Sequence, residues 1–178
     1  MKLRQKVYKK NKIYIGKAVD FCNDEIILPN GKKATREYIY HPGAVAVVPF
    51  LDKTDIILVR QYRYPIDEIT YEIPAWKLDI GKKESSLECA KRELKEETGY
   101  SAKTIKKLIS FWPSSAFSNE KLVIYVARNL IQGKANPDND EFIKNLVLPF
   151  KKALQMVKQG KIKDSKTIIA LLYIASKI

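Results

Sequence analysis

The segment from Arg92 to Tyr100 reads Arg-Glu-Leu-Lys-Glu-Glu-Thr-Gly-Tyr and decides the fold, because it places three carboxylates on one predicted helix. The helix is predicted to begin at Ser85, since residues 85–88 read Ser-Ser-Leu-Glu and match a capping box. Gly99 predicts its end, because glycine readily takes the left-handed conformation that closes many helices. An apolar stripe at helical spacing identifies the buried side: Leu87, Ala90 and Leu94.

The carboxylates of this helix predict a metal site. Glu93 and Glu97 are one helical turn apart, and Glu96 lies beside them. Like charges at this spacing repel one another, more so beside a buried stripe, so a positive group should offset them. Arg92 can pair with Glu96, and the remaining carboxylate oxygens suit Mg²⁺ or Mn²⁺. The alternative is a solvated helix whose glutamates pair with the neighbouring lysines.

The complete pattern resembles the Nudix box. The box reads Gly, five residues, Glu, seven residues, then Arg-Glu-apolar-x-Glu-Glu-x-Gly-apolar. Counting seven residues back from Arg92 reaches Glu84, which supplies the first Glu. Leu78 stands where the box has its first Gly, so the chain departs from the pattern there.

Other motifs resemble the ADP-ribose pyrophosphatase branch of the Nudix hydrolase family. The resemblance covers roughly Tyr14 to the C-terminus and depends on residues 59–65 (Val-Arg-Gln-Tyr-Arg-Tyr-Pro), 72–75 (Glu-Ile-Pro-Ala), 117–120 (Phe-Ser-Asn-Glu) and the acidic loop before Phe142. Three features depart from the branch: Trp76 follows Pro74-Ala75 in place of Gly, Lys82-Lys83 lengthens the next loop, and residues 114–118 read Ser-Ser-Ala-Phe-Ser. These departures bear on substrate preference more than on catalysis.

The resemblance implies a Mg²⁺-dependent hydrolase, with Mn²⁺ as an alternative. Glu93 and Glu97 would be the principal metal ligands, Glu96 would complete a second ion, and Arg92 would orient Glu93 and Glu96. A backbone carbonyl at Ala75 normally reaches the metal in this branch. The general base would come from the late acidic loop, where Glu141 is the first choice and Asp140 the second.

The same resemblance implies the substrate contacts. Arg63 and Arg36 would bind the substrate phosphates, because guanidinium groups match phosphate geometry. Phe21 is a candidate for stacking on adenine. Arg60 and Glu72 are predicted to form a structural ion pair beside the site.

The remaining pattern predicts the fold. Apolar runs predict six strands, at residues 12–19, 25–28, 44–50, 55–64, 108–112 and 121–129. Turn residues predict hairpin connections at 29–31 and 51–54, and a further strand is expected to begin at Phe142-Ile143. Two closing helices are predicted, one over 151–158 ended by Gly160 and one begun by Asp164 or Ser165. These elements indicate an α+β fold, and the resemblance implies a Nudix α/β/α sandwich with a mixed sheet over 43–178 and an antiparallel β extension for dimerisation over 1–42.

Composition narrows the class of protein. The 178 residues are 46% hydrophobic and 30% charged, as in a folded globular domain. Neither a membrane span nor a signal peptide is evident, so we expect a cytoplasmic protein without a membrane partner. Cys22 and Cys89 are read as reduced thiols, and the single His41 cannot build a His-rich zinc site. The net charge of +13 favours anions at the surface, although a lysine-rich proteome would explain it equally well.

The function expected from the resemblance is hydrolysis of ADP-ribose to AMP and ribose 5-phosphate by a homodimer with exchanged N-terminal sheets. One alternative is another nucleoside diphosphate-linked substrate, such as an ADP-sugar, a dinucleotide or a flavin diphosphate. A second is a catalytically silent domain that binds nucleotide or RNA, suggested by the net charge and the loop at Trp76. The intact carboxylate cluster argues against silence, so nucleic acid is not the partner we expect.

Overall fold

The computed structural model describes residues 3–78, 81, 84–134 and 142–177. The chain divides into two compact units, one of residues 1–43 with 112–121 and one of residues 44–111 with 122–178. The predicted box helix and both closing helices belong to the second unit.

The first unit is an antiparallel sheet, as the turn pattern predicted. Strand β3 (Asp20–Ile27) pairs along its length with β4 (Lys33–Tyr40), and its other edge pairs with β1 (Lys6–Lys9) and β2 (Lys12–Ile15). The predicted turn between β3 and β4 is present, and Gly31 has the positive φ of 83° that the turn needs. Residues 112–121 join this unit through Ile39 N, which donates to the Phe117 carbonyl at 2.8 Å.

The second unit contains two sheets. The first is mixed, in the order β8 (Ala75–Lys77), β5 (Ala44–Pro49), β10 (Leu122–Gln132) and β9 (Tyr100–Phe111), because β5 and β10 run parallel while the other pairs are antiparallel. The second is antiparallel, in the order β11 (Lys144–Pro149), β6 (Asp55–Arg63) and β7 (Glu68–Glu72), with a 3-10 turn at Tyr64–Ile66 between β6 and β7.

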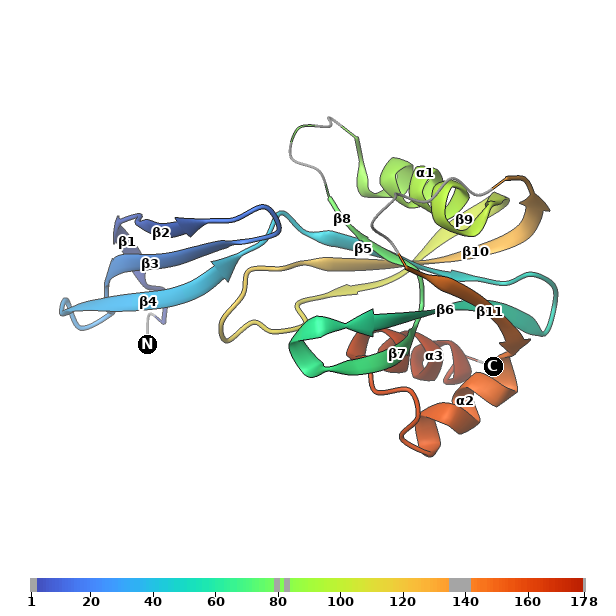
Figure 1. Ribbon diagram of the computed structural model, residues 1–178. Helices are drawn as coiled ribbons and strands as arrows, with labels where there is room; N and C mark the ends of the chain where they lie inside the picture. The colour runs from blue at the N-terminus through green and yellow to red at the C-terminus, as the bar shows by residue number, and fades with distance from the viewer. Residues whose placement is uncertain (1–2, 79–80, 82–83, 135–141, 178) are drawn as a thin grey trace. The chain divides into compact units, whose positions relative to one another are not determined.

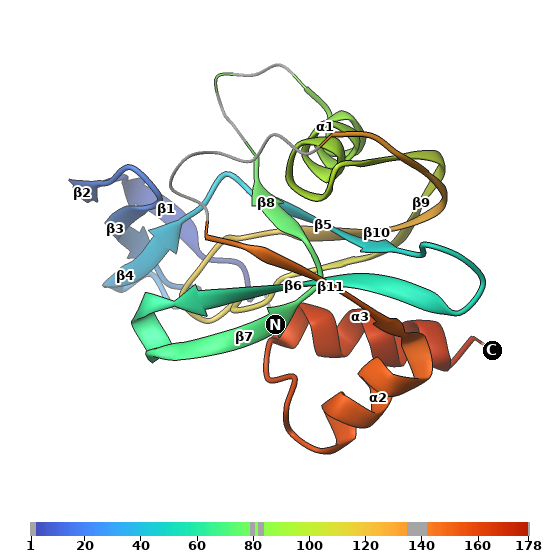
Figure 2. The ribbon, with the colours of Figure 1, turned by 45° about the vertical axis from the view of Figure 1, so that its right-hand side comes forward.

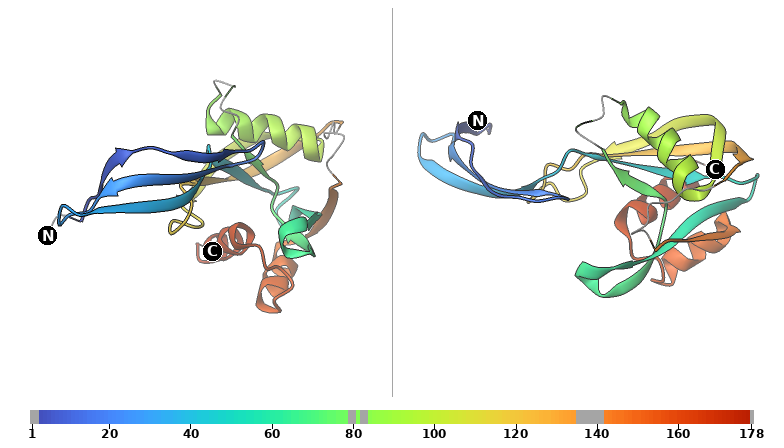
Figure 3. Two further views of the ribbon diagram at one scale, coloured as in Figure 1. Left: turned by 60° about the vertical axis from the view of Figure 1, so that its left-hand side comes forward. Right: turned by 45° about the horizontal axis from the view of Figure 1, so that its top comes forward.

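Helices cover the outer faces of this unit, which gives the predicted sandwich. Helix α1 (Ser86–Thr98) lies over the mixed sheet, and α2 (Phe150–Lys158) and α3 (Ser165–Ala175) lie on the opposite side (Figures 1 and 2). The two further views in Figure 3 show the same layers within the unit. None of the helices in the described part of the chain has the length and apolarity that crossing a lipid bilayer requires.

Every residue of β5 is buried because its alternating side chains enter two cores. Ala44, Ala46 and Val48 pack with α2 and α3, whereas Val45 and Val47 pack beneath α1. Both cores therefore depend on the same strand, and α1 packs against its Val45 and Val47 side.

Several element boundaries differ from the sequence predictions. Strands β1, β4, β7 and β8 were missed because they are short or polar, and β9 begins at Tyr100, directly after α1, rather than at 108. The turn at 51–54 joins strands of different sheets, so it is no regular hairpin: only Phe50 and Ile56 form an antiparallel bridge. Strand β11 begins at Lys144, and Phe142 lies before it with 90% of its surface exposed.

Candidate active site

Helix α1 has the capped ends that the sequence predicted. Glu88 N donates to Ser85 Oγ at 3.3 Å, and Ser85 N donates to Glu88 Oε2 at 2.7 Å, which completes the capping box. Gly99 closes the helix with a φ of 76°. The buried face carries Cys89, Ala90, Leu94 and Thr98. Because this face is fixed against β5, the neighbouring glutamates are held at its half-buried margin.

Arg92 gathers the carboxylates of the site. Its guanidinium lies 2.7 Å from Glu84, 2.8 Å from Glu93 and 2.8 Å from Glu96, so the predicted Arg92–Glu96 pair is present within a larger cluster. The side chain of Arg92 is 29% exposed. The hydrogen bonds that Arg92 donates to Glu84 raise the pKa of Arg92 above its usual value, against the opposing effect of burial, and Glu93 and Glu96 raise it further. The guanidinium therefore stays charged and fixes the direction of three carboxylates.

Glu93 and Glu97 are half-buried on the same helix, one turn apart. In the described ranges, no three His, Cys, Asp or Glu side chains form a ready-made metal cage. Mg²⁺ does not need one, because it keeps several waters and binds through one or two carboxylates together with substrate phosphates. The donor chemistry of this pair thus fits a hard divalent cation, and the assignment of these ligands remains a prediction.

Ala75 is half-buried on β8, in register opposite Ala46 of β5. The carbonyl of the preceding Pro74 already accepts a hydrogen bond from Val47 N at 3.0 Å. The role of the Ala75 carbonyl as a metal ligand stays a prediction. Glu141 and Asp140, the two candidates for the general base, lie outside the described residues.

Trp76 is a core residue rather than a loop residue. Its side chain is 7% exposed and packs in the apolar cluster beneath α1 with Val45, Cys89 and Leu94. A ring in this position cannot stack on a nucleic-acid base. One of the two reasons for considering a silent RNA-binding domain is therefore wrong.

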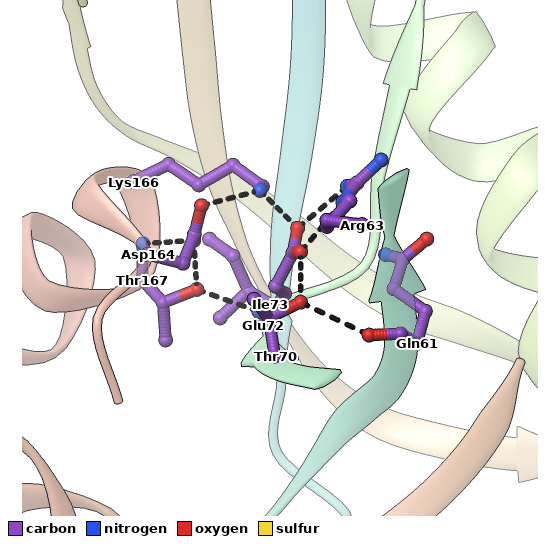
Figure 4. A network of polar contacts seen from close by, with 8 residues as sticks. All are labelled: Gln61, Arg63, Thr70, Glu72, Ile73, Asp164, Lys166 and Thr167. Carbon is purple, nitrogen blue, oxygen red and sulfur yellow. Dashed lines mark hydrogen bonds and ion pairs between the residues drawn. The ribbon is translucent and has the colours of Figure 1, made fainter. Parts of the chain in front are cut away.

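The predicted ion pair between Arg60 and Glu72 is also wrong, because Arg63 takes that place. Arg63 Nε donates to Glu72 Oε1 and Nη2 donates to Oε2, both at 2.7 Å (Figure 4). Residue 60 lies opposite Tyr71 in the β6–β7 register, and its guanidinium packs 5.9 Å from the Tyr71 ring centre. Since alternate residues of a strand point to opposite faces, Arg63 shares the face of Glu72 and Arg60 does not.

Glu72 is the most buried charged group of this network, with 2% of its side chain exposed. It also accepts a hydrogen bond from Thr70 Oγ1 at 2.6 Å and one from Lys166 Nζ. Burial alone would raise the pKa of Glu72, but the hydrogen bonds from Arg63, the charge of Lys166 and the Thr70 hydroxyl outweigh it and lower the pKa to about 2. Glu72 is therefore ionised at neutral pH.

Arg63 is the member of this network whose charge interacts with Glu97 of the acidic helix. Its side chain is 43% exposed. The hydrogen bonds that Arg63 donates to Glu72 raise the pKa of Arg63 against burial, and the charges of Asp164 and Glu97 act in the same direction. The charge of the predicted metal ligand Glu97 thus acts on the Arg63 guanidinium. A negatively charged phosphate bound near Glu97 would need a positive group of this kind.

The first turn of α3 supplies residues that the sequence analysis did not assign to the site. Asp164 caps the helix, accepting from Thr167 N at 3.0 Å, and Thr167 Oγ1 accepts from Ile73 N at 2.8 Å (Figure 4). A cavity of about 320 Å³ is lined in part by Arg63, Glu72 and Lys166. The signal available in the sequence was the Asp-Ser-Lys-Thr start of the helix, but nothing in it indicated contact with β7.

Arg36 and Phe21 lie in the first unit. Arg36, on β4, is exposed, and its Nη1 donates to the Thr35 carbonyl at 2.8 Å. Phe21, on β3, has 39% of its surface exposed. Both side chains are accessible, and their contact with substrate remains a prediction.

Comparisons of the sequence and the fold with known proteins agree with the resemblance to Nudix hydrolases. The family model of the NUDIX domain matches residues 40–171. A methanol dehydrogenase activator from Bacillus methanolicus is 41% identical over 172 residues, which cover 96% of this chain and 92% of the relative. An ADP-ribose pyrophosphatase from Bacillus subtilis (strain 168) is 38% identical over 177 residues, covering 98% and 95%. A crystal structure of an ADP compounds hydrolase superposes with a TM-score of 0.85 at 21% identity, covering 99% of this chain and 95% of that chain.

Proposed function

This chain belongs to the Nudix family of pyrophosphohydrolases, and on that premise we propose that it hydrolyses ADP-ribose to AMP and ribose 5-phosphate with Mg²⁺ as cofactor. The observation that carries the proposal is the Arg92-centred cluster, which holds Glu93 and Glu96 on a capped helix, while the charge of Glu97 acts on Arg63. The extended similarity to an ADP-ribose pyrophosphatase supports the choice of substrate.

The proposed reaction adds one water across the diphosphate: the water oxygen bonds to one phosphorus, and the bridging oxygen leaves with the other phosphate. Glu93 and Glu97 would hold Mg²⁺, which neutralises phosphate charge and activates water when bound. Arg92 keeps Glu93 and Glu96 oriented, since each of these pairs is 2.8 Å long. Arg63 would donate its outer N–H groups to a phosphate. Glu141, or else Asp140, would take the proton of the attacking water.

Hydrolysis of ADP-ribose by the purified protein tests this proposal. We expect turnover with Mg²⁺, none with EDTA, and a fall in kcat of about 100-fold or more in Glu97→Gln. Glu88→Gln is the matched control, because it removes a carboxylate from the same helix while Gln still completes a capping box. Turnover that survives in Glu97→Gln would remove the box helix from the mechanism.

The alternatives are separated in the same assay. Faster turnover of an ADP-sugar, a dinucleotide or a flavin diphosphate would assign the enzyme to another nucleoside diphosphate-linked substrate. No turnover on any of them, together with RNA affinity that falls steeply with salt, would favour a silent binding domain.

We also propose a homodimer formed through the extension at 1–42. Every residue of β1 and β2 is exposed, although apolar side chains such as Val7 (58%), Ile13 (56%) and Ile15 (73%) are among them. A second copy covering these side chains would remove apolar surface from water. Light scattering after size-exclusion chromatography should give twice the chain mass of 20.5 kDa, and the Ile13→Lys, Ile15→Lys double variant should give the chain mass. A monomeric parent protein would exclude the dimer.

A cytoplasmic location completes the proposal. Cys22 and Cys89 are both free and buried in the structure, as expected of a protein from a reducing compartment.

A further inference from the structure

Lys166 is largely buried, with 14% of its side chain exposed, and it forms ion pairs with Glu72 and Asp164. Its Nζ lies 2.8 Å from Asp164 Oδ1 and also donates to Glu72 Oε2. Burying an ammonium group is costly unless anions compensate it, so the two carboxylates explain why the lysine is held there. Neither carboxylate is among the expected metal ligands.

Glu72 is shared by two cations. Its Oε2 accepts from both Lys166 and Arg63 Nη2, while Oε1 accepts from Arg63 Nε and Thr70 (Figure 4). Only two of the five N–H donors of the Arg63 guanidinium are used in these bonds. The network thus anchors Arg63 through Nε and Nη2, while 43% of its side chain stays exposed.

The charges of the network balance. Arg63 and Lys166 are positive, and Glu72 and Asp164 are negative, so the four groups carry no net charge. Without Lys166 the same cluster would carry one negative charge, and Glu72 would have Arg63 as its remaining cationic partner. A substrate diphosphate approaching Arg63 would then meet a net negative cluster, which opposes binding.

We propose that Lys166 is a positioning residue for phosphate binding, acting through Glu72 to keep Arg63 oriented and electrostatically available to the substrate. This inference rests on the proposed function, since it assigns Arg63 to the diphosphate. It gives the start of α3 a part in substrate affinity although Lys166 itself does not contact the reacting atoms.

The test compares Lys166→Met, Lys166→Arg and Lys163→Met in steady-state hydrolysis of ADP-ribose. Lys163 is the matched control, because it lies in the same segment but pairs with exposed Glu68 at 2.8 Å. We expect Lys166→Met to raise KM about ten-fold, with kcat within about two-fold of the parent. Lys166→Arg should restore most of the affinity, and Lys163→Met should match the parent.

Calorimetric titration with inorganic pyrophosphate, without metal, gives a readout independent of turnover. Lys166→Met should weaken pyrophosphate binding by about the same ten-fold. If Lys166→Met lowers the unfolding midpoint but leaves both KM and pyrophosphate affinity unchanged, the residue is structural only and the inference is overturned. If the parent does not hydrolyse ADP-ribose, the proposed function fails, and the pyrophosphate titration then decides the inference by itself.

Discussion

Replacing Glu72 by glutamine should destabilise the fold by several kcal/mol although the two side chains have nearly the same shape. The change removes the charge that Arg63 and Lys166 share, and it leaves the two cations of the network with Asp164 in place of two anions. Removing one member of a buried ion pair costs about 3–5 kcal/mol, because the remaining charge loses its compensation.

The lowered pKa of Glu72 gives a second value for the loss of stability. Lowering it from its usual 4.5 to about 2 means that ionised Glu72 stabilises the folded state by about 3 kcal/mol at pH 7. Because the folded-state pKa is depressed, this contribution is present above about pH 4.5 and is lost as the pH falls toward 2. At pH 3 about 1.5 kcal/mol of it should remain.

Urea unfolding followed by tryptophan fluorescence checks both values, since Trp76 is buried in the fold. Glu72→Gln should lose about 3 kcal/mol at pH 7 and about half of that at pH 3. Glu68→Gln, on the same strand but in an exposed pair with Lys163, should lose less than about 1 kcal/mol. Equal losses in the two variants, or a loss in Glu72→Gln that does not change with pH, would refute the reasoning.

Three further predictions follow from single contacts. Arg92→Met should reduce kcat by at least about ten-fold, because Glu84, Glu93 and Glu96 lose their shared cation. Lys91→Met, at an exposed position of the same helix, should leave kcat unchanged, and equal rates in the two variants would contradict the orienting role of Arg92. Thr167→Val should lower the free energy of unfolding by about 1–3 kcal/mol, measured in urea, because fully buried Thr167 accepts from Ile73 N; an unchanged midpoint would argue against that bond. Burial raises the pKa of the Cys89 thiol to about 11, and the charges of Glu84 and Glu93 add to this effect. Cys89 should therefore react with Ellman's reagent at pH 8 only after unfolding, and rapid reaction of the native thiol would contradict its burial.

Local signals in the sequence were sufficient for the box helix. The capping box at Ser85, the apolar stripe and Gly99 determine where α1 begins, which face is buried and where it ends, and the structure confirms all three. The pairing of Arg92 with Glu96 was equally predictable, because it depends only on a spacing of four residues. The polar or short strands β1, β4, β7 and β8 gave no comparable signal, since apolar alternation was the evidence for strands.

The Arg63–Glu72 pair shows where local reasoning was incomplete. The sequence paired Arg60 with Glu72 and assigned Arg63 to the substrate phosphates, but only the strand register determines which arginine shares the face of Glu72. Once β6 and β7 are aligned, the two-residue period of a strand selects Arg63 and directs Arg60 toward Tyr71. Trp76 is a similar case, because its place in the core depends on how β8 packs beneath α1.

The sequence by itself determined the family, the α+β sandwich and the carboxylates at one-turn spacing, because helix caps, periodicity and short-range charge pairs are properties of neighbouring residues. Only the tertiary structure decided that Lys166 and Thr167, more than ninety residues beyond β7, bond to Glu72 and Ile73. Contacts of this kind depend on how α3 packs against β7, and no pattern of adjacent residues encodes the distance between two elements so far apart in the chain.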